Sequence, residues 1–229
     1  MQIVRPKQPL AKVVYALAPS SCLRCGVLGS DLCKTCRPFA LIAKTASCFS
    51  CNALSEEFKT CHRCRKITPL SRVYIASHYE GVVKDLITRL KYHYAVDNGK
   101  IIGHMLSEHV VDEYDAVVAV PTSAKRYRQR GFNPSLEIAK TVAANIKTPH
   151  VNALYRLGNT QQVGSDRGHR LSQLNEMIEV RRSVPSRLGG VRVLLIDDVV
   201  TTGATLSECA KVLKQAGAKS VEAAVLAKH

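Results

Sequence analysis

The stretch that decides the fold is Val193-Leu-Leu-Ile-Asp-Asp-Val-Val-Thr-Thr-Gly-Ala-Thr205. The mostly apolar run Val191–Ile196 predicts a buried strand of a parallel sheet. After the acids, the apolar residues of the segment 205–216 recur at helical spacing and predict a helix. Asp197 and Asp198 are therefore expected at the carboxyl end of a strand, where ligands bind in open α/β sheets.

The residues between this strand and the helix carry hydroxyl groups around one glycine. A helix N-terminus has unpaired N–H groups and a positive dipole end, which favour a phosphate. Because carboxylates cannot bind that phosphate, we expect the two acids to bind sugar hydroxyls, with or without Mg²⁺. The residues expected to bind phosphate and ribose here are Asp197, Asp198, Val199, Val200, Thr201, Thr202, Gly203, Ala204 and Thr205. The alternative is an ordinary turn with a threonine cap, which requires neither the paired acids nor three threonines.

The rest of the chain alternates between strand and helix patterns. The expected strands are 73–77, 115–120, 151–157 and 220–227, and the expected helices are 82–92, 100–111 and 134–146. This alternation predicts an α/β fold with a mostly parallel sheet. Residues 158–175 contain few hydrophobic residues and predict a long loop, which usually has a function in a compact domain.

A second candidate site follows the strand that ends at Val120. The segment Pro121–Asn133 contains four cations in six positions, Lys125, Arg126, Arg128 and Arg130. A basic loop at the carboxyl end of a parallel strand can hold pyrophosphate through charge-assisted hydrogen bonds. We therefore expect Lys125 and Arg130 on the pyrophosphate side of the site. Lys91, outside this segment, is a further candidate for that side. A solvated basic loop or a nucleic-acid patch is the alternative.

Eight of the nine cysteines form four Cys-x-x-Cys pairs. The pairs are Cys22 with Cys25, Cys33 with Cys36, Cys48 with Cys51, and Cys61 with Cys64. Two such turns complete a tetrahedral zinc site, so we expect about two structural Zn²⁺ ions per chain. A disulfide scaffold suits a secreted chain better than this one. Sequential pairing gives two consecutive ribbons and is favoured by the short spacers, and interleaved pairing in a cross-brace is the alternative.

Composition and charge set further limits. The formal net charge is +15, and residues 1–72 hold 12 Lys and Arg against three Asp and Glu. Such an excess is typical of proteins that bind a polyanion. No apolar run approaches the roughly 18 residues of a membrane helix, and Leu10–Leu17 fits a short amphipathic helix better than a signal peptide. We expect a cytoplasmic protein with a zinc module over residues 1–70, including that helix, and an α/β domain over residues 71–229.

The chain resembles the ComF/GntX family of competence-associated proteins. The motifs that carry this resemblance are the four cysteine pairs, Tyr79 with Gly81, Leu86–Tyr92, Pro121 with Arg130-Gly-Phe-Asn133, and Asp197–Thr205. The last of these is similar to the phosphoribosyl pyrophosphate signature of type I phosphoribosyltransferases. The resemblance implies a zinc finger joined to a phosphoribosyltransferase-like domain that binds phosphoribosyl pyrophosphate with Mg²⁺. If that domain is catalytic, the expected catalytic residues are Asp197, Asp198, Arg130 and Lys125.

The same resemblance implies a role in natural transformation. Incoming single-stranded DNA and proteins of the DNA-import machinery, such as a helicase, are the partners it implies. Two other functions fit the sequence: a metabolic phosphoribosyltransferase acting on a small base, and an adaptor whose zinc ribbons recruit a partner. The cysteines and the charge favour DNA uptake over salvage, which needs neither. The intact Asp197–Thr205 stretch argues against an adaptor.

Overall fold

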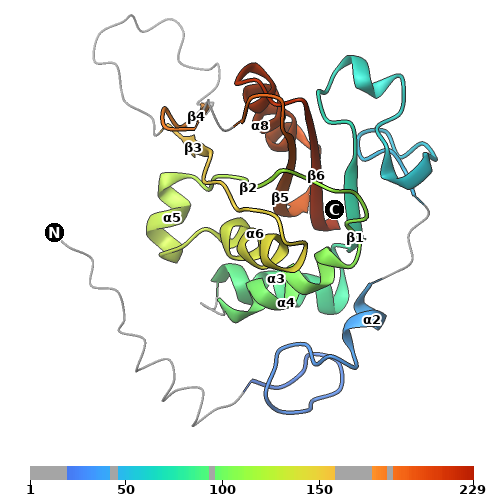
Figure 1. Ribbon diagram of the computed structural model, residues 1–229. Helices are drawn as coiled ribbons and strands as arrows, with labels where there is room; N and C mark the ends of the chain where they lie inside the picture. Colours follow the sequence, from blue (N-terminus) through green and yellow to red (C-terminus); the bar gives the residue numbers. More distant parts are fainter. Residues whose placement is uncertain (1–19, 42–45, 93–95, 158–176, 185–187) are drawn as a thin grey trace, which may run out of the picture.

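The computed structural model describes residues 20–41, 46–92, 96–157, 177–184 and 188–229 (Figure 1). The expected helix over Leu10–Leu17 and the expected loop over 158–175 lie outside the described residues. Among the helices that the structure describes, none is both long and apolar enough to cross a membrane.

Four parallel strands form the main sheet, in the order β1-β6-β5-β2. They are β1 (Val73–His78), β6 (Ser220–Lys228), β5 (Arg192–Val200) and β2 (Ala116–Ala119). In β6 every residue between the two ends is buried, as expected for a strand that is covered on both faces of a parallel sheet. The predicted parallel α/β fold is confirmed.

Helices cover both faces of this sheet (Figure 1). One face packs against α3 (Gly81–Tyr92), α4 (Asp97–Ser107) and α6 (Pro134–Asn145), and the other against α8 (Ala204–Gln215). Successive residues of β5 alternate between these two cores, because side chains alternate along a strand. Leu194 and Ile196 join the first core, and Leu195 joins the second.

Strand β5 continues beyond its predicted end. The sequence predicted a strand over Val191–Ile196 with both acids at its carboxyl end, but the pairing continues to Val200, which lies opposite Lys228. The reason is the length of β6, which extends the ladder past the acids. Asp197, which pairs with Val225, is therefore fixed by the sheet itself.

The basic segment after Val120 contains a helix, where the sequence predicted a loop. Helix α5 (Ala124–Arg130) begins after Ser123, whose hydroxyl accepts a hydrogen bond from the Arg126 N–H at 3.3 Å. It ends at Gly131, which has a φ of +76°. A serine N-cap and a left-handed glycine are ordinary signals of a helix start and end. The helix could therefore have been predicted from Ser123 and Gly131, but the run of cations was interpreted as a loop.

The expected strand over 151–157 is shorter and lies outside the main sheet. Strand β3 (Leu154–Arg156) pairs in antiparallel fashion with β4 (Ile178–Val180) in a separate two-stranded sheet. Figure 1 shows this small sheet near the end of β2 and next to α5. It brings Arg156 toward the carboxyl edge of the main sheet.

The cysteine-rich part, residues 20–41 and 46–66, consists mainly of turns. It contains α2 (Arg37–Ala40) and two short 3₁₀ turns, η1 (Glu56–Phe58) and η2 (Cys64–Lys66). Its first half contacts α3 and α4, since the buried Asp31 accepts hydrogen bonds from Arg89 and Asn98 at 2.7 Å each. Its second half packs on the opposite face of the sheet, where Phe49 shares a core with α8.

Candidate functional site

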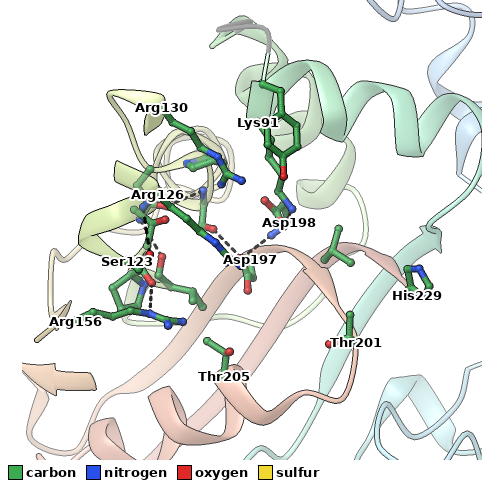
Figure 2. Close-up of a pocket in the computed structure, with 18 of the residues that line it drawn as sticks. Lys91, Ser123, Arg126, Arg130, Arg156, Asp197, Asp198, Thr201, Thr205 and His229 are labelled. Carbon is green, nitrogen blue, oxygen red and sulfur yellow. Dashed lines mark hydrogen bonds and ion pairs between the residues drawn. The ribbon is translucent and has the colours of Figure 1, made fainter. Parts of the chain in front are cut away.

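A cavity of about 430 Å³ opens at the carboxyl edge of the main sheet (Figure 2). Residues that end or follow all four parallel strands line it: Tyr79 after β1, Pro121 after β2, Thr201 after β5 and His229 after β6. This is the edge at which ligands bind in open α/β sheets. Helices α3, α5 and α6 complete the wall.

Two adjacent carboxylates lie in the middle of this wall (Figure 2). The Asp197 carboxylate accepts hydrogen bonds from the Ser135 hydroxyl at 2.7 Å and from the Asp198 N–H at 2.9 Å. Asp198 pairs with Lys91, whose Nζ lies 2.7 Å from its Oδ1. Burial, together with the neighbouring charge of Asp198, raises the pKa of Asp197 to about 7. The site therefore contains one carboxyl group that titrates near neutral pH.

Four cationic side chains among the described residues line the same cavity, Lys91, Arg126, Arg130 and Arg156. Arg126 and Arg130 are four residues apart, so they share one face of α5. The Arg130 guanidinium lies 5.0 Å from the centroid of the Tyr92 ring, and Arg156 Nε donates to the Pro121 carbonyl at 2.8 Å. With four cations against two carboxylates, the wall favours a polyanionic ligand that also carries hydroxyl groups.

The hydroxyl loop, residues Thr201–Thr205, runs from the end of β5 into the first turn of α8. Thr201 and Thr205 line the cavity (Figure 2). Gly203 has a φ of +79°, a conformation that favours glycine, and its carbonyl accepts from the Ser207 N–H at 2.9 Å. Helix α8 begins directly after it, so the first turn of a twelve-residue helix lies beside the cavity. Such a helix N-terminus is suited to an anionic group.

The structure brings most of the expected site residues together. Those that line the cavity are Lys91, Arg130, Asp197, Asp198, Val199, Thr201 and Thr205. Of the described residues expected in the site, Lys125, Val200, Thr202, Gly203 and Ala204 lie off the cavity wall. Val200 is buried in the core, and Thr202 Oγ1 accepts from the Ala204 N–H at 3.3 Å.

Lys125 is exposed on α5, and its neighbour Arg126 faces the cavity instead. A helix rotates by about 100° per residue, so Lys125 cannot share the face of Arg126 and Arg130. The prediction of Lys125 assumed that this segment is a loop. The four-residue spacing of Arg126 and Arg130, which indicates one face of a helix, was overlooked. Arg156 and Ser135 were also missed: Arg156 lies on a strand outside the main sheet, and Ser135 follows the cap of α6.

The eight paired cysteines form two groups of four. One group is Cys22, Cys25, Cys33 and Cys36, and the other is Cys48, Cys51, Cys61 and Cys64. Within each group the sulfur atoms lie within 4.8 Å of one another. This confirms the sequential pairing and excludes the cross-brace.

The spacing of these sulfur atoms fits a metal ion. Four thiolates about 2.3 Å from one tetrahedral ion are about 3.8 Å apart. The Sγ atoms of Cys25 and Cys33 are 3.8 Å apart, and those of Cys51 and Cys61 are 3.6 Å apart. Although burial opposes it, backbone N–H donors lower the pKa of Cys22 and of Cys48 to about 6, whereas burial and the neighbouring thiols raise the pKa of Cys36 and of Cys64 to about 12. Each group can therefore hold a metal ion through four sulfur ligands.

Comparison with known sequences identifies the class of this domain. Residues 135–229 match the phosphoribosyl transferase domain family. Together with the parallel sheet and the acid pair at its carboxyl edge, this match defines a type I phosphoribosyltransferase-like domain, which is joined here to two Cys₄ groups. One solved structure, an allosteric regulatory enzyme of purine biosynthesis, is 22% identical with a TM-score of 0.41, over 58% of this chain and 25% of its own.

Curated relatives narrow the class further. Competence protein ComFC of Streptococcus pneumoniae is 32% identical over 147 residues, which is 63% of this chain and 62% of the relative. Competence protein F of Haemophilus influenzae is 25% identical over 218 residues, covering 83% of this chain and 93% of the relative. DNA utilization protein YhgH of Escherichia coli is 24% identical over 215 residues, covering 83% and 94%. The match spans less than two thirds of the pneumococcal protein. These relatives confirm the resemblance to the ComF family.

Proposed function

We propose that the cavity binds phosphoribosyl pyrophosphate and that the protein acts in DNA uptake during natural transformation. One arrangement carries the first part: Asp197 and Asp198 lie between the hydroxyl loop and a wall of cations. A ligand with a phosphate at one end, sugar hydroxyls in the middle and a polyanionic group at the other end matches this order of groups.

The 5′-phosphate is assigned to the hydroxyl loop. Thr201 and Thr205 offer hydroxyl donors there, and the first turn of α8 offers backbone N–H groups. The neighbouring Asp197 and Asp198 accept hydrogen bonds from the ribose hydroxyls, for which ionised carboxylates are strong acceptors. Asp197 must release its proton in this role, because its raised pKa leaves it partly protonated near pH 7.

The pyrophosphate is assigned to the cationic wall. Lys91, Arg126 and Arg130 line that side, so Arg126 takes the role that the sequence assigned to Lys125. A Mg²⁺ ion bound with the ligand supplies further charge neutralisation, and carboxylate and phosphate oxygens are its usual ligands. In a transfer reaction these cations stabilise the charge that develops on the departing pyrophosphate as an acceptor attacks C1 of the sugar.

A small base is the acceptor in the second candidate function, a metabolic phosphoribosyltransferase. The match to the phosphoribosyl transferase domain favours this chemistry. The two Cys₄ groups and the basic surface favour the role in DNA uptake, since a salvage enzyme requires neither.

Each Cys₄ group is proposed to bind one structural Zn²⁺, because four thiolates in tetrahedral spacing are a typical structural zinc site. We propose that residues 1–70 form this zinc module and residues 71–229 the phosphoribosyltransferase-like domain. We also propose that the whole protein, including this module, is cytoplasmic.

The role in DNA uptake is supported by the names of the relatives and by surface charge. Two relatives are competence proteins, and YhgH is a DNA utilization protein. Exposed cations lie on α5, at Lys125 and Arg128, and in the cysteine-rich part, at Arg24, Lys34, Arg63, Arg65 and Lys66. Such cations bind phosphates of single-stranded DNA without strong sequence preference. A helicase of the DNA-import machinery is the protein partner proposed from the same resemblance.

Two single substitutions test the orientation of the ligand. Thr205→Val removes one hydroxyl from the phosphate side, and Arg130→Ala removes one cation from the pyrophosphate side. Isothermal titration with ribose 5-phosphate should show roughly tenfold weaker binding for Thr205→Val and wild-type binding for Arg130→Ala. Titration with pyrophosphate and Mg²⁺ should show the reverse. Equal losses of both ligands in both variants would contradict the orientation.

A further inference from the structure

The hydroxyl loop is in direct contact with the second cysteine group. Phe49 follows Cys48, is 2% exposed, and packs in the core that also contains α8. A Cβ atom added to Gly203 would lie 2.4 Å from Cε2 and 2.9 Å from Cδ2 of Phe49. The aromatic ring therefore lies against the backbone of the loop at its left-handed residue.

Three hydrogen bonds join the segment that carries this group to residues on either side of the loop. Lys228, which pairs with Val200 at the end of β5, donates from Nζ to the Phe49 carbonyl at 2.6 Å and also to Asn52 Oδ1. On the other side, Thr68 Oγ1 lies 2.9 Å from Ser207 Oγ in the first turns of α8. The segment that carries the second cysteine group thus contacts the end of β6 beside the loop, the loop itself and the helix after it.

The first cysteine group makes its polar contacts elsewhere. Its Asp31 binds Arg89 of α3 and Asn98 of α4, on the opposite face of the sheet. The second group can therefore influence the hydroxyl loop and the first cannot, although the sulfur geometry of the two groups is alike.

We propose that Phe49 is a positioning residue for phosphate binding, and that metal bound by Cys48, Cys51, Cys61 and Cys64 holds it against Gly203. This inference rests on the proposed function of the loop. Phosphate binding by backbone N–H groups requires that the loop be set in advance, because each misplaced donor loses most of its hydrogen bond. Phe49 follows the metal-binding Cys48, and Asn52 follows the metal-binding Cys51. Metal binding therefore fixes the contact of Phe49 with Gly203 and that of Asn52 with Lys228.

Reciprocal coupling follows from this contact. If metal at the second group favours the binding conformation of the loop, then a ligand on the loop must favour retention of that metal by the same factor. The metal of the first group has no part in this coupling. A residue that only filled space in the core would not link the two binding events.

The test compares Phe49→Ala and the milder Phe49→Leu with Phe39→Ala as the matched control. Phe39 lies in α2 of the first group, is 65% exposed, and stacks under Arg24. Metal content and thermal unfolding identify the variants that keep both ions and the fold. We expect ribose 5-phosphate to bind roughly tenfold more weakly or worse to Phe49→Ala, with Phe49→Leu between it and wild type. The control should bind as wild type does.

Hydrogen exchange of residues 200–207 in the ligand-free protein provides the second measurement. We expect faster exchange there in both Phe49 variants and no change in Phe39→Ala. Should Phe49→Ala fail to fold, Phe49→Leu decides both measurements. A wild type that fails to bind ribose 5-phosphate would refute the proposed function, while loop exchange would still decide whether Phe49 holds the loop. Wild-type exchange and wild-type affinity in a folded, metal-loaded Phe49 variant would overturn the inference.

The rate of metal release measures the coupling between the second cysteine group and the ligand on the loop. Chelator-driven loss of one of the two ions should become slower when ribose 5-phosphate is present, and Phe49→Leu should reduce that difference. Identical release curves with and without saturating ligand in the wild type would overturn the metal-dependent part of the proposal.

Discussion

Lys91 and Asp198 form an ion pair of 2.7 Å that joins the last turn of α3 to the end of β5 at the cavity wall. Their side chains are 19% and 9% exposed, so the pair is held largely away from water. Lys91 thus contacts the Asp198 carboxylate and also lines the side of the cavity that is proposed to bind pyrophosphate. It is both a structural partner and a candidate ligand residue.

Replacing this lysine should therefore destabilise the folded protein. Lys91→Met leaves the Asp198 carboxylate buried without its cation, which we expect to lower the free energy of unfolding by about 1–3 kcal/mol. Lys100→Met is the control, because its pair with Asp97 at 2.7 Å is exposed on both sides. We expect a change below about 0.5 kcal/mol there. Denaturant unfolding with equal effects of the two substitutions would contradict this account of the pair.

The raised pKa of Asp197 predicts how stability depends on pH. The pKa is about 7 in the folded protein, against about 3.9 in the unfolded chain. The folded state therefore binds the proton more tightly, and the free energy of unfolding falls as the pH rises from about 4 to about 7. Above that range the destabilisation is fully present.

Asp197→Asn removes this contribution. We expect the variant to be about 1 kcal/mol or more stable than wild type at pH 8, with little difference at pH 4. Glu208→Gln, at an exposed position of α8, is the control for the loss of one negative charge. Unfolding curves measured at several pH values check this. Parallel profiles for wild type and Asp197→Asn would show that Asp197 does not titrate in this range.

Metal content tests the cysteine groups. Purified protein should contain about two Zn²⁺ per chain, and Cys25→Ser or Cys51→Ser should each lose about one ion. Chelation should unfold the cysteine-rich part before the α/β domain, because metal binding supplies much of the stability of a small ribbon. Intact disulfides by mass spectrometry, with no zinc present, would contradict the assignment.

DNA binding is expected to be electrostatic and sensitive to salt. Four to six phosphate contacts with a slope near −0.7 per contact lower the affinity for single-stranded DNA by roughly tenfold or more between about 50 and 200 mM salt. The double substitution Lys125→Ala/Arg128→Ala should weaken binding further, whereas Lys211→Ala/Lys219→Ala, at exposed positions away from α5, should have little effect. Fluorescence anisotropy measures both. Absence of binding at 50 mM salt would mean that the basic surface serves another purpose.

The sequence predicted the sheet and the cysteine pairing well, because both depend on local patterns. The apolar run before Asp197 and the short spacers between cysteine pairs carry enough information by themselves. The end of β5 was predicted too early, since it depends on how far β6 extends beside it. Arg156 and the contact between Phe49 and Gly203 depend on segments far apart in the chain, which no local pattern reveals.

The central claim is that the acid pair and the hydroxyl loop bind phosphoribosyl pyrophosphate. Isothermal titration of the wild type and of Asp197→Ala/Asp198→Ala, in the presence of Mg²⁺, tests it most directly. We expect saturable binding of one ligand per chain by the wild type and no measurable binding by the variant. The thermal transition of the variant should change little, because removal of the buried Asp197 charge offsets the loss of the ion pair between Asp198 and Lys91. Equal affinity in the two proteins would contradict the assignment of the site.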